Sequence, residues 1–325
     1  MALRNTIFFT FFLIASLIAL LTPFTTSQNA NVSAIFIFGD STIDPSNNNH
    51  INTLFHSDHP PYGIDFPGRV PTRKFCDGKL VTDFLISSLG IKELLPAYFV
   101  SVGSSLDLQT IIITQALDLP THLNKFYEAL QRMEGVVGQE EVRRIVKNAL
   151  FLISFGSNDM LFNYYDIPTR ALDCSLPGYH QMQLQTMYGF IENLYKLGAR
   201  RIAVAGLPPI GCVPAQVTIG SILPISTNFI QRSSYNQQLK ALTSSWQSKL
   251  QSSRIVYADI YSPIMDMIQN PNNNACCGTG LAEAGPLCQD ASKYIFFDSV
   301  HLTEAAYRAI ADITRNNLFP RVAGN

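Results

Sequence analysis

The amino-acid sequence predicts an α/β fold in which helices cover both faces of a central parallel sheet. Its apolar, β-rich runs are continuous instead of alternating with polar residues, which is typical of strands that are buried on both faces. Segments with helical periodicity separate these runs, and this succession favours parallel strands joined by right-handed crossovers. No repeat, low-complexity tract or linker divides the chain, so residues 28–325 are predicted to form a single domain.

These two patterns place the elements along the chain. Continuous apolar runs predict strands at 34–38, 149–155, 201–207 and 254–260. Amphipathic patterns predict helices at 79–90, 119–134, 140–147, 181–197, 231–250 and 304–318. In the fourth of these helices Met187, Phe190, Ile191 and Leu194 have the spacing of one helix face, and Gly198 is suited to end it.

The first residues have the pattern of an export signal. Arg4 precedes the apolar run 7–21, and a proline with small residues follows up to Ser27. We interpret residues 1–27 as a signal peptide. A membrane anchor is the alternative, but the run is short for a bilayer span and no later segment approaches that length. The Asn-Val-Ser sequence at Asn31 adds a predicted glycosylation site, and the protein is expected to be secreted.

Composition narrows the classes of partner and cofactor. The formal net charge is −1 and no basic stripe is present, so nucleic acid is not an expected partner. The six cysteines are an even number, which favours disulfides in an exported protein. Cys276, Cys277 and Cys288 border a Gly-rich loop and predict at least one local bridge. A zinc site is the alternative, but no histidine lies nearby and adjacent cysteines suit tetrahedral ligation poorly, so no metal or cofactor is expected.

A Gly-Asp-Ser-Thr sequence at residues 39–42 follows the first predicted strand. The carboxyl ends of parallel strands open onto the ligand crevice of an α/β fold, which makes Ser41 a candidate nucleophile. An ordinary turn is the alternative, because glycine, aspartate and asparagine are common turn residues. The choice depends on whether a base, an orienting acid and oxyanion donors occur elsewhere in the chain.

An aspartate and a histidine precede the last predicted helix. Asp298 lies three residues before His301, so the carboxylate can bond one imidazole nitrogen while the other faces Ser41. The alternative is a helix entry in which Asp298 caps backbone amides and His301 is exposed. The other five histidines are interpreted as solvated residues of a loop and of helix starts: His50, His56, His59, His122 and His180.

A third polar turn follows the second predicted strand. Gly156 permits a tight turn against a ligand, and the side-chain amide of Asn158 is suited to donate to an oxyanion. An Asx turn, in which Asn158 caps the next segment, is the alternative. Together the three turns supply a serine, an asparagine and an Asp/His pair, and their joint occurrence favours a serine hydrolase site over three unrelated turns.

These motifs resemble those of the plant GDSL esterase/lipase family of SGNH hydrolases over about residues 33–318. The residues that carry the resemblance are 38–42, 47–49, 156–159, 206–212, 276–280, 285–288 and 298–301. The resemblance implies a flavodoxin-like three-layer α/β/α fold and metal-independent ester hydrolysis. It implies Ser41 as nucleophile, His301 as general base and then acid, and Asp298 as its orienting partner. The backbone amide of Ser41 and the side chain of Asn158 would serve the oxyanion hole, and Thr42 replaces the leucine of the family name.

One segment departs from the pattern of that family. After its second strand the family carries a glycine block, and one glycine amide of this block is the remaining oxyanion donor. Here residues 94–98 run directly into 99–104, which resembles a worn form of the block and makes Gly103 the predicted donor. The loop and strand start that precede the block are missing. Loss of one oxyanion donor costs about 2.7–4 kcal/mol of transition-state stabilisation.

The sequence thus predicts a secreted serine esterase or lipase that hydrolyses carboxylic esters through an acyl-enzyme intermediate. Two alternatives stay open. An acyltransferase on the same scaffold would use an alcohol in place of water, and a catalytically weakened or non-catalytic extracellular protein would follow from the eroded glycine block. The expected substrate is a small-molecule, lipid or polyester ester, and no membrane span is expected after signal cleavage.

Overall fold

The computed structural model describes residues 32–45, 55–90, 104–222, 234–269, 276 and 287–323. The chain from Val32 to Asn325 forms one compact unit. Several predictions fall outside the described residues, among them the signal peptide at 1–27, the glycosylation site at Asn31, the solvated His50 and the oxyanion donor Gly103. None of the helices in the described part of the chain combines the length and the apolar character that a membrane crossing requires.

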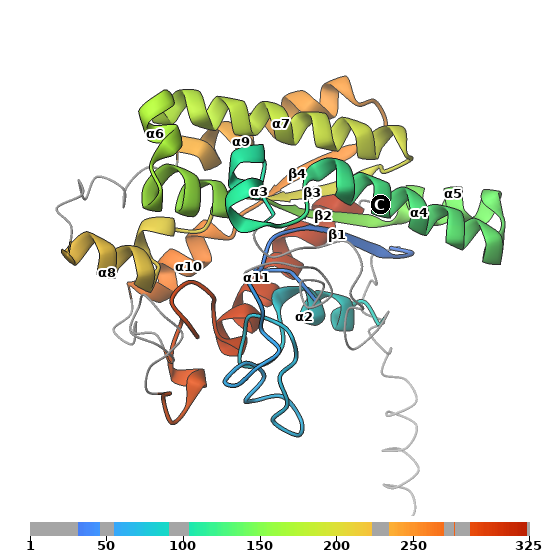
Figure 1. Ribbon diagram of the computed structural model, residues 1–325. Coiled ribbons are helices and arrows are strands. Elements are labelled where there is room, and N and C mark those ends of the chain that lie inside the picture. Colours follow the sequence, from blue (N-terminus) through green and yellow to red (C-terminus); the bar gives the residue numbers. More distant parts are fainter. Residues whose placement is uncertain are drawn as a thin grey trace, which may run out of the picture. The chain divides into compact units, whose positions relative to one another are not determined.

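A parallel sheet forms the centre of the described residues (Figure 1). Its strands are β1 (Ile35–Gly39), β2 (Leu150–Ser154), β3 (Arg201–Ala205) and β4 (Arg254–Ala258), in the order β1-β2-β3-β4. All four predicted strands are confirmed, with small differences at their ends. The order corresponds to the 1-3-4-5 part of the flavodoxin-like order 2-1-3-4-5. Residues 91–103, which include the predicted oxyanion donor Gly103, are not described.

Helices cover both faces of this sheet, as predicted (Figure 1). One face packs against α4 (Leu119–Val137), α5 (Gln139–Asn148), α7 (Leu176–Lys196) and α9 (Ser234–Lys249). The other face packs against α2 (Val81–Ser88) and α11 (Glu304–Ala323). The described residues thus form the three-layer α/β/α arrangement that the sequence predicts.

Several short helices lie in the connections and were not predicted. They are α3 (Leu108–Thr114), the π-helix η2 (Asp159–Asp166), α6 (Thr169–Asp173), the 3₁₀ turns η3 (Ile210–Cys212) and η5 (Ala291–Lys293), α8 (Pro214–Ile222) and α10 (Tyr261–Ile268). Most span only one or two turns, which is too short for an amphipathic period to stand out in the sequence.

Two long helices, α7 and α11, differ from the prediction by five residues at one end. α7 begins at Leu176 and not at residue 181, because Pro177 occupies its first turn, where a missing backbone N–H leaves no hydrogen bond unmade. α11 continues beyond residue 318 to Ala323, since side chains of its last turn belong to the apolar cluster on that face of the sheet. Tertiary packing therefore decides where this last helix ends.

Aromatic rings fill the face of the sheet that α4 covers. Phe126 of α4 is fully buried, and its ring centroid lies 5.0 Å from that of Phe36, 5.6 Å from that of Phe38 and 5.6 Å from that of Phe151. These pairs meet edge to face, an arrangement that stabilises them beyond the burial of their area. The rings of β1 and β2 are thereby locked to α4, and the strands keep a fixed register behind the turns that follow them.

Truncation of Phe126 tests this packing. We expect Phe126→Ala to lower the free energy of unfolding by about 3–5 kcal/mol, because it leaves a cavity among three rings. Tyr127→Ala is the matched control, since Tyr127 is 53 % exposed and its truncation should change stability by no more than about 0.5 kcal/mol. Urea denaturation followed by circular dichroism measures both values, and equal losses for the two variants would contradict the assignment of Phe126 to the core.

Candidate active site

β1 delivers Ser41 into a tight turn at the carboxyl edge of the sheet. Oδ1 of Asp40 accepts hydrogen bonds from the backbone amide of Thr42 at 3.1 Å and from its hydroxyl at 2.8 Å. The amide of Asp40 donates to the carbonyl of Ser154 on β2 at 3.2 Å. A side chain at Gly39 would collide with that same carbonyl, so the close approach of β1 to β2 requires glycine. Ser41 is 5 % exposed and is held at the wall of a pocket.

The loop before α11 pairs Asp298 with His301. Nδ1 of His301 lies 2.7 Å from Oδ2 of Asp298, and Oδ1 accepts the amides of Val300 at 2.8 Å and His301 at 2.6 Å. Asp298 is 2 % exposed, and the hydroxyl of Tyr62 donates to its Oδ2 at 3.0 Å. Burial alone would raise the pKa of Asp298, but the charge of His301 and these hydrogen bonds hold it below its ordinary value. Asp298 therefore both caps backbone amides and orients the imidazole. His301 is buried, and is not exposed as the alternative expected.

Aromatic side chains surround this pair. The ring centroid of Phe75 lies 4.8 Å from that of His301, and Tyr62 packs 5.2 Å from Phe75. Phe297, next to Asp298, lies 5.8 Å from Tyr62. These contacts leave the imidazole little freedom to rotate, so its orientation toward Asp298 is fixed by packing as well as by hydrogen bonding.

The disulfide between Cys276 and Cys288 confirms the predicted local bridge. Both cysteines belong to the apolar cluster that contains Tyr62, Phe75 and Phe297, and the bridge therefore supports the loop of the candidate base. Cys277 lies outside the described residues, and the remaining cysteines are not in disulfides: Cys76, Cys174 and Cys212. Over the described ranges no group of three or more histidine, cysteine or acidic side chains is placed to hold a metal ion.

Two side-chain-to-backbone hydrogen bonds, made by Asp77 and Glu304, join the start of α11 to the segment before α2. Oδ1 of Asp77 accepts the backbone amide of Glu304 at 2.7 Å, and Oε2 of Glu304 accepts the amide of Lys79 at 2.8 Å. Burial raises the pKa of Asp77 to about 6. These bonds anchor the chain three residues after His301. The sequence carried no signal for them, because Asp77 and Glu304 are 227 positions apart.

β2 delivers Asn158 to the same edge of the sheet. Gly156 turns the chain with a φ of 112°, a conformation that side chains disfavour. Nδ2 of Asn158 donates to the carbonyl of Ser104 at 3.0 Å, and Asn158 lines the same pocket as Ser41. Its side chain makes no capping hydrogen bond to η2, so the Asx-turn alternative is wrong.

Asp159 anchors the turn that carries Asn158. Its buried carboxylate accepts the amides of Leu106 at 2.9 Å and Asp107 at 3.1 Å, and the hydroxyl of Thr110 at 2.8 Å. Burial raises the pKa of Asp159 to about 6. Asp107 in turn accepts two hydrogen bonds from the guanidinium of Arg170, at 2.7 and 2.9 Å. This network joins the segment after Ser105 to the turn of Asn158.

His122 and His180 correct the interpretation that the other histidines are solvated. Both lie near helix starts, as expected, but their helices pack on the sheet and bury them. Nε2 of His122 lies 3.0 Å from Oγ of Ser104, the residue whose carbonyl receives the bond from Asn158. Burial lowers the pKa of His180 to about 4. The contact of His122 with Ser104 thus helps to hold the residue that orients Asn158, the candidate oxyanion donor. The sequence did not predict this contact.

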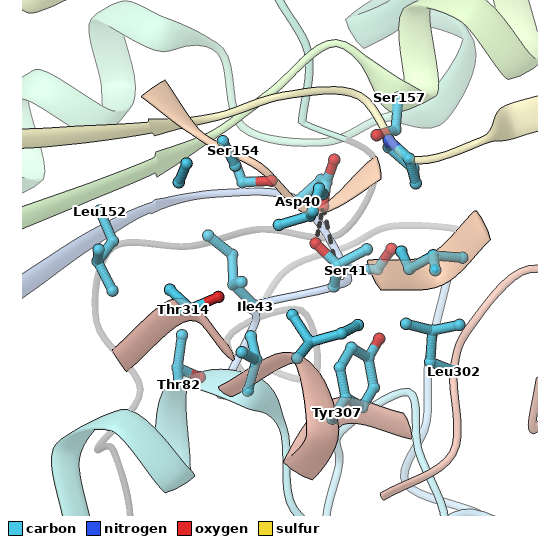
Figure 2. Close-up of a pocket in the computed structure, with 18 of the residues that line it drawn as sticks. Asp40, Ser41, Ile43, Thr82, Leu152, Ser154, Ser157, Leu302, Tyr307 and Thr314 are labelled. Carbon is cyan, nitrogen blue, oxygen red and sulfur yellow. Dashed lines mark hydrogen bonds between the residues drawn. The ribbon is translucent and has the colours of Figure 1, made fainter. Parts of the chain in front are cut away.

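Ser41 and Asn158 line one pocket with a volume of about 110 Å³. Figure 2 shows Ser41 and Leu302 at this pocket. Val300 and Leu302, the neighbours of His301, line it as well. Burial raises the pKa of Asp40, and hydrogen bonds from Thr42 and the nearby charge of His301 oppose that rise. The nucleophile turn, the asparagine turn and the Asp298–His301 loop therefore meet at this pocket.

The chain is similar to known proteins over most of its length. The sequence model of the family described as GDSL-like Lipase/Acylhydrolase matches residues 35–314. Three similar proteins of Arabidopsis thaliana are each named GDSL esterase/lipase. The first is 43 % identical over 96 % of this chain and 97 % of its own length, the second 39 % over 85 % and 84 %, and the third 37 % over 86 % and 88 %.

The first of these alignments also bears on the length of the chain. It spans 351 positions, whereas the present sequence has 325 residues. The relative therefore carries residues that have no counterpart here.

The lowered pKa of Asp298 predicts a contribution to acid stability. Because its pKa is lower in the folded protein than the value of about 3.9 in unfolded chains, ionised Asp298 stabilises the fold above about pH 4, and this contribution is lost as the pH falls further. We expect the free energy of unfolding of the wild type to fall more steeply on acidification than that of Asp298→Asn. Urea denaturation across a pH series measures the two slopes.

The exposed Asp312 of α11 offers the control for this series. Asp312→Asn should retain the steepness of the wild type. Equal slopes for the wild type and Asp298→Asn would contradict the role assigned to the buried pair.

Proposed function

The chain belongs to the GDSL-like lipase/acylhydrolase family, and from this premise we propose that it hydrolyses carboxylic esters with Ser41 as the nucleophile. The observation that carries the proposal is the buried Asp298–His301 pair beside the pocket that Ser41 lines. A serine hydroxyl is a weak nucleophile until a base removes its proton, and an oriented imidazole supplies that base. The relatives' names, GDSL esterase/lipase, support a carboxylic ester substrate.

In the acylation step Oγ of Ser41 attacks the ester carbonyl and Nε2 of His301 takes its proton. Asp298 accepts Nδ1–H of the same ring, holds it in the tautomer that leaves Nε2 able to accept, and stabilises the imidazolium that forms. Breakdown of the tetrahedral intermediate cleaves the bond between carbonyl carbon and alkoxy oxygen. His301 returns its proton to the departing alcohol, and the acyl group stays on Ser41.

The negative charge of the tetrahedral intermediate falls on the former carbonyl oxygen. In the proposed site the backbone amide of Ser41 and Nδ2 of Asn158 donate to this oxygen, with the amide of Gly103 as a third donor. Asn158 is supported for this task because its amide is already oriented by Ser104 and its turn is anchored by Asp159. Donors held in place before the reaction stabilise the charge without reorganising.

Deacylation repeats these steps with water. His301 removes a proton from a water molecule, the resulting oxygen nucleophile attacks the acyl carbonyl, and the proton then returns to Oγ of Ser41 as the acid leaves. An alcohol in place of water would make the protein an acyltransferase, and analysis of products in the presence of glycerol distinguishes the two outcomes.

We also propose that the protein acts outside the cell as one hydrolase domain that follows a cleaved signal peptide at 1–27. The apolar run after Arg4 supports export, and the disulfide between Cys276 and Cys288 is a bond that persists in oxidising compartments. The family match over residues 35–314 supports a single domain. Asn31 would then lie near the mature amino terminus as a glycosylation site.

Replacement of Ser41 is the decisive test of the proposed function. Ser41→Ala should lower kcat for p-nitrophenyl butanoate by at least about 10⁴-fold, because the covalent route is lost. Ser248→Ala on the exposed side of α9 is the control and should keep the wild-type rate. Undiminished hydrolysis by Ser41→Ala would refute the assignment. Labelling of the wild type at Ser41 by a fluorophosphonate probe would count against a non-catalytic role.

Replacement of Asn158 tests the oxyanion hole. Asn158→Ala should lower kcat by about 10²–10³-fold with a much smaller change in KM, because the donor acts mainly on the transition state. The exposed Asn193 of α7 supplies the control Asn193→Ala, which should leave both constants unchanged. A melting temperature for each variant separates loss of a donor from loss of folding. An unchanged kcat in folded Asn158→Ala would contradict the role of this residue.

A further inference from the structure

The pocket that begins at Ser41 extends beneath the sheet, between its strands and α11 (Figure 2). Ser41, Ser157 and Leu302 lie toward one side of it, and Leu152, Thr82 and Thr314 toward the other. We propose that this buried space takes the acyl chain of the ester, so that the protein selects unbranched acyl groups of short to medium length. The inference rests on the proposed function, because it assumes that the carbonyl is held at Ser41.

Small side chains on the sheet create the space. The row at the carboxyl edge contains Ser154, Ala205 and Ala258, all of which line the pocket, and Ala205 pairs with Ala258. Ala203 lies one step deeper on the same face. Protein interiors are close-packed, so a face of small residues opposite a helix leaves volume that other side chains would normally fill. The opposite face, filled by phenylalanine rings, has no such series.

α11 supplies the opposite wall. Tyr307, Ile310, Thr314 and Leu318 all line the pocket, and their spacing places them along one side of the helix. Tyr307 and Thr314 are seven residues apart, which is roughly 10 Å along a helix axis. The wall is thus long and mostly aliphatic beyond Tyr307, as an extended hydrocarbon chain requires.

Buried hydroxyl groups in this wall are suited to donate to an ester oxygen. The hydroxyls of Tyr307 and Thr82 are buried and donate no hydrogen bond to a described residue. Buried polar groups are normally paired, and unpaired ones call for an explanation. Tyr307 lies close enough to Asp40, the neighbour of Ser41, for the charge of that carboxylate to act on it. The hydroxyl of Tyr307 therefore marks the end of the pocket at which the ester group would sit.

The size of the pocket limits the chain. An apolar cavity of about 150 Å³ in another protein is large enough to bind benzene. The present pocket has a volume of about 110 Å³. This volume is smaller than the cavity that holds the six carbons of benzene, and the wall of roughly 10 Å is long enough for a short extended chain, so the pocket favours acyl groups of roughly four to six carbons. An acetyl group would leave most of the apolar wall uncovered, and a dodecanoyl group would exceed the space.

The first experiment compares acyl lengths. We expect kcat/KM of the wild type on p-nitrophenyl esters to rise from acetate to a maximum between butanoate and hexanoate and to fall at dodecanoate. Thr314→Phe, which places a ring on the wall from a half-buried helix position, should move this maximum to shorter chains. It should lower kcat/KM for hexanoate relative to acetate by about tenfold, the effect of losing one or two buried methylene groups.

Two further variants keep this test decisive. Thr314→Ala cannot overfill the pocket and should shift the maximum toward longer chains. Ile313→Phe adds the same ring at the adjacent residue, which is 41 % exposed, and should keep the wild-type profile. The proposal is overturned if folded Thr314→Phe and Thr314→Ala both keep the wild-type preference, or if Ile313→Phe shifts it as strongly as Thr314→Phe.

A binding measurement separates this inference from the proposed function. Titration calorimetry of Ser41→Ala with sodium hexanoate needs no catalysis and should show binding that Thr314→Phe, introduced into the same protein, weakens about tenfold. If hydrolysis proves independent of Ser41 while hexanoate binding responds to Thr314→Phe, the proposed function is wrong and the pocket stands. If hydrolysis depends on Ser41 but neither chain preference nor hexanoate binding responds to Thr314, the acyl pocket is wrong and the proposed function stands.

Discussion

The ionised, buried carboxylate of Asp298 is the constraint on which the candidate active site depends. A charge removed from water is tolerated only where donors surround it. Here the donors are the imidazole of His301, two amides of its own loop and the hydroxyl of Tyr62. To supply the last of these, a segment more than 200 residues earlier in the chain must pack against the loop. The aromatic cluster and the disulfide between Cys276 and Cys288 then enclose the contact, so satisfying one carboxylate also fixes the plane of the candidate base.

A second buried carboxylate has the corresponding task for the turn of Asn158. Asp159 collects two amides and a hydroxyl from the segment that begins at Leu106, and Arg170 binds the neighbouring Asp107. The turn of Asn158 cannot shift without breaking these bonds. Burial works against ionisation of Asp159, as its raised pKa shows, whereas Asp298 gains enough from the charge of His301 to stay below its ordinary pKa. The pKa values of these two buried aspartates are therefore shifted in opposite directions. Asp298 orients the candidate base, and Asp159 anchors the backbone of a turn.

The two faces of the sheet are packed differently. Phenylalanine rings fill the face under α4, and their packing holds β1 and β2 in register behind the turns of Ser41 and Asn158. On the face under α11, one serine and two alanines take positions nearest the carboxyl edge and leave a pocket that reaches Ser41. Close packing on one side thus makes it possible to leave space on the other without loss of strand alignment. The proposed acyl pocket is a consequence of residue size at a few sheet positions.

The sequence by itself determined what depends on short spacings. Continuous apolar runs located all four described strands, a separation of three residues brought Asp298 to His301, and twelve residues separate the bridged cysteines. The strand ends placed Ser41 and Asn158 at one edge of the sheet, because parallel strands end together. Only the tertiary structure decided what joins distant segments: the hydrogen bond of Tyr62 to Asp298, the side-chain-to-backbone hydrogen bonds of Asp77 and Glu304, the burial of His122 against Ser104, and the space beneath the sheet. A local sequence pattern indicates which face of an element is apolar. It does not indicate which residue from elsewhere in the chain packs against that face, and the contacts between distant segments depend on the identity of that residue.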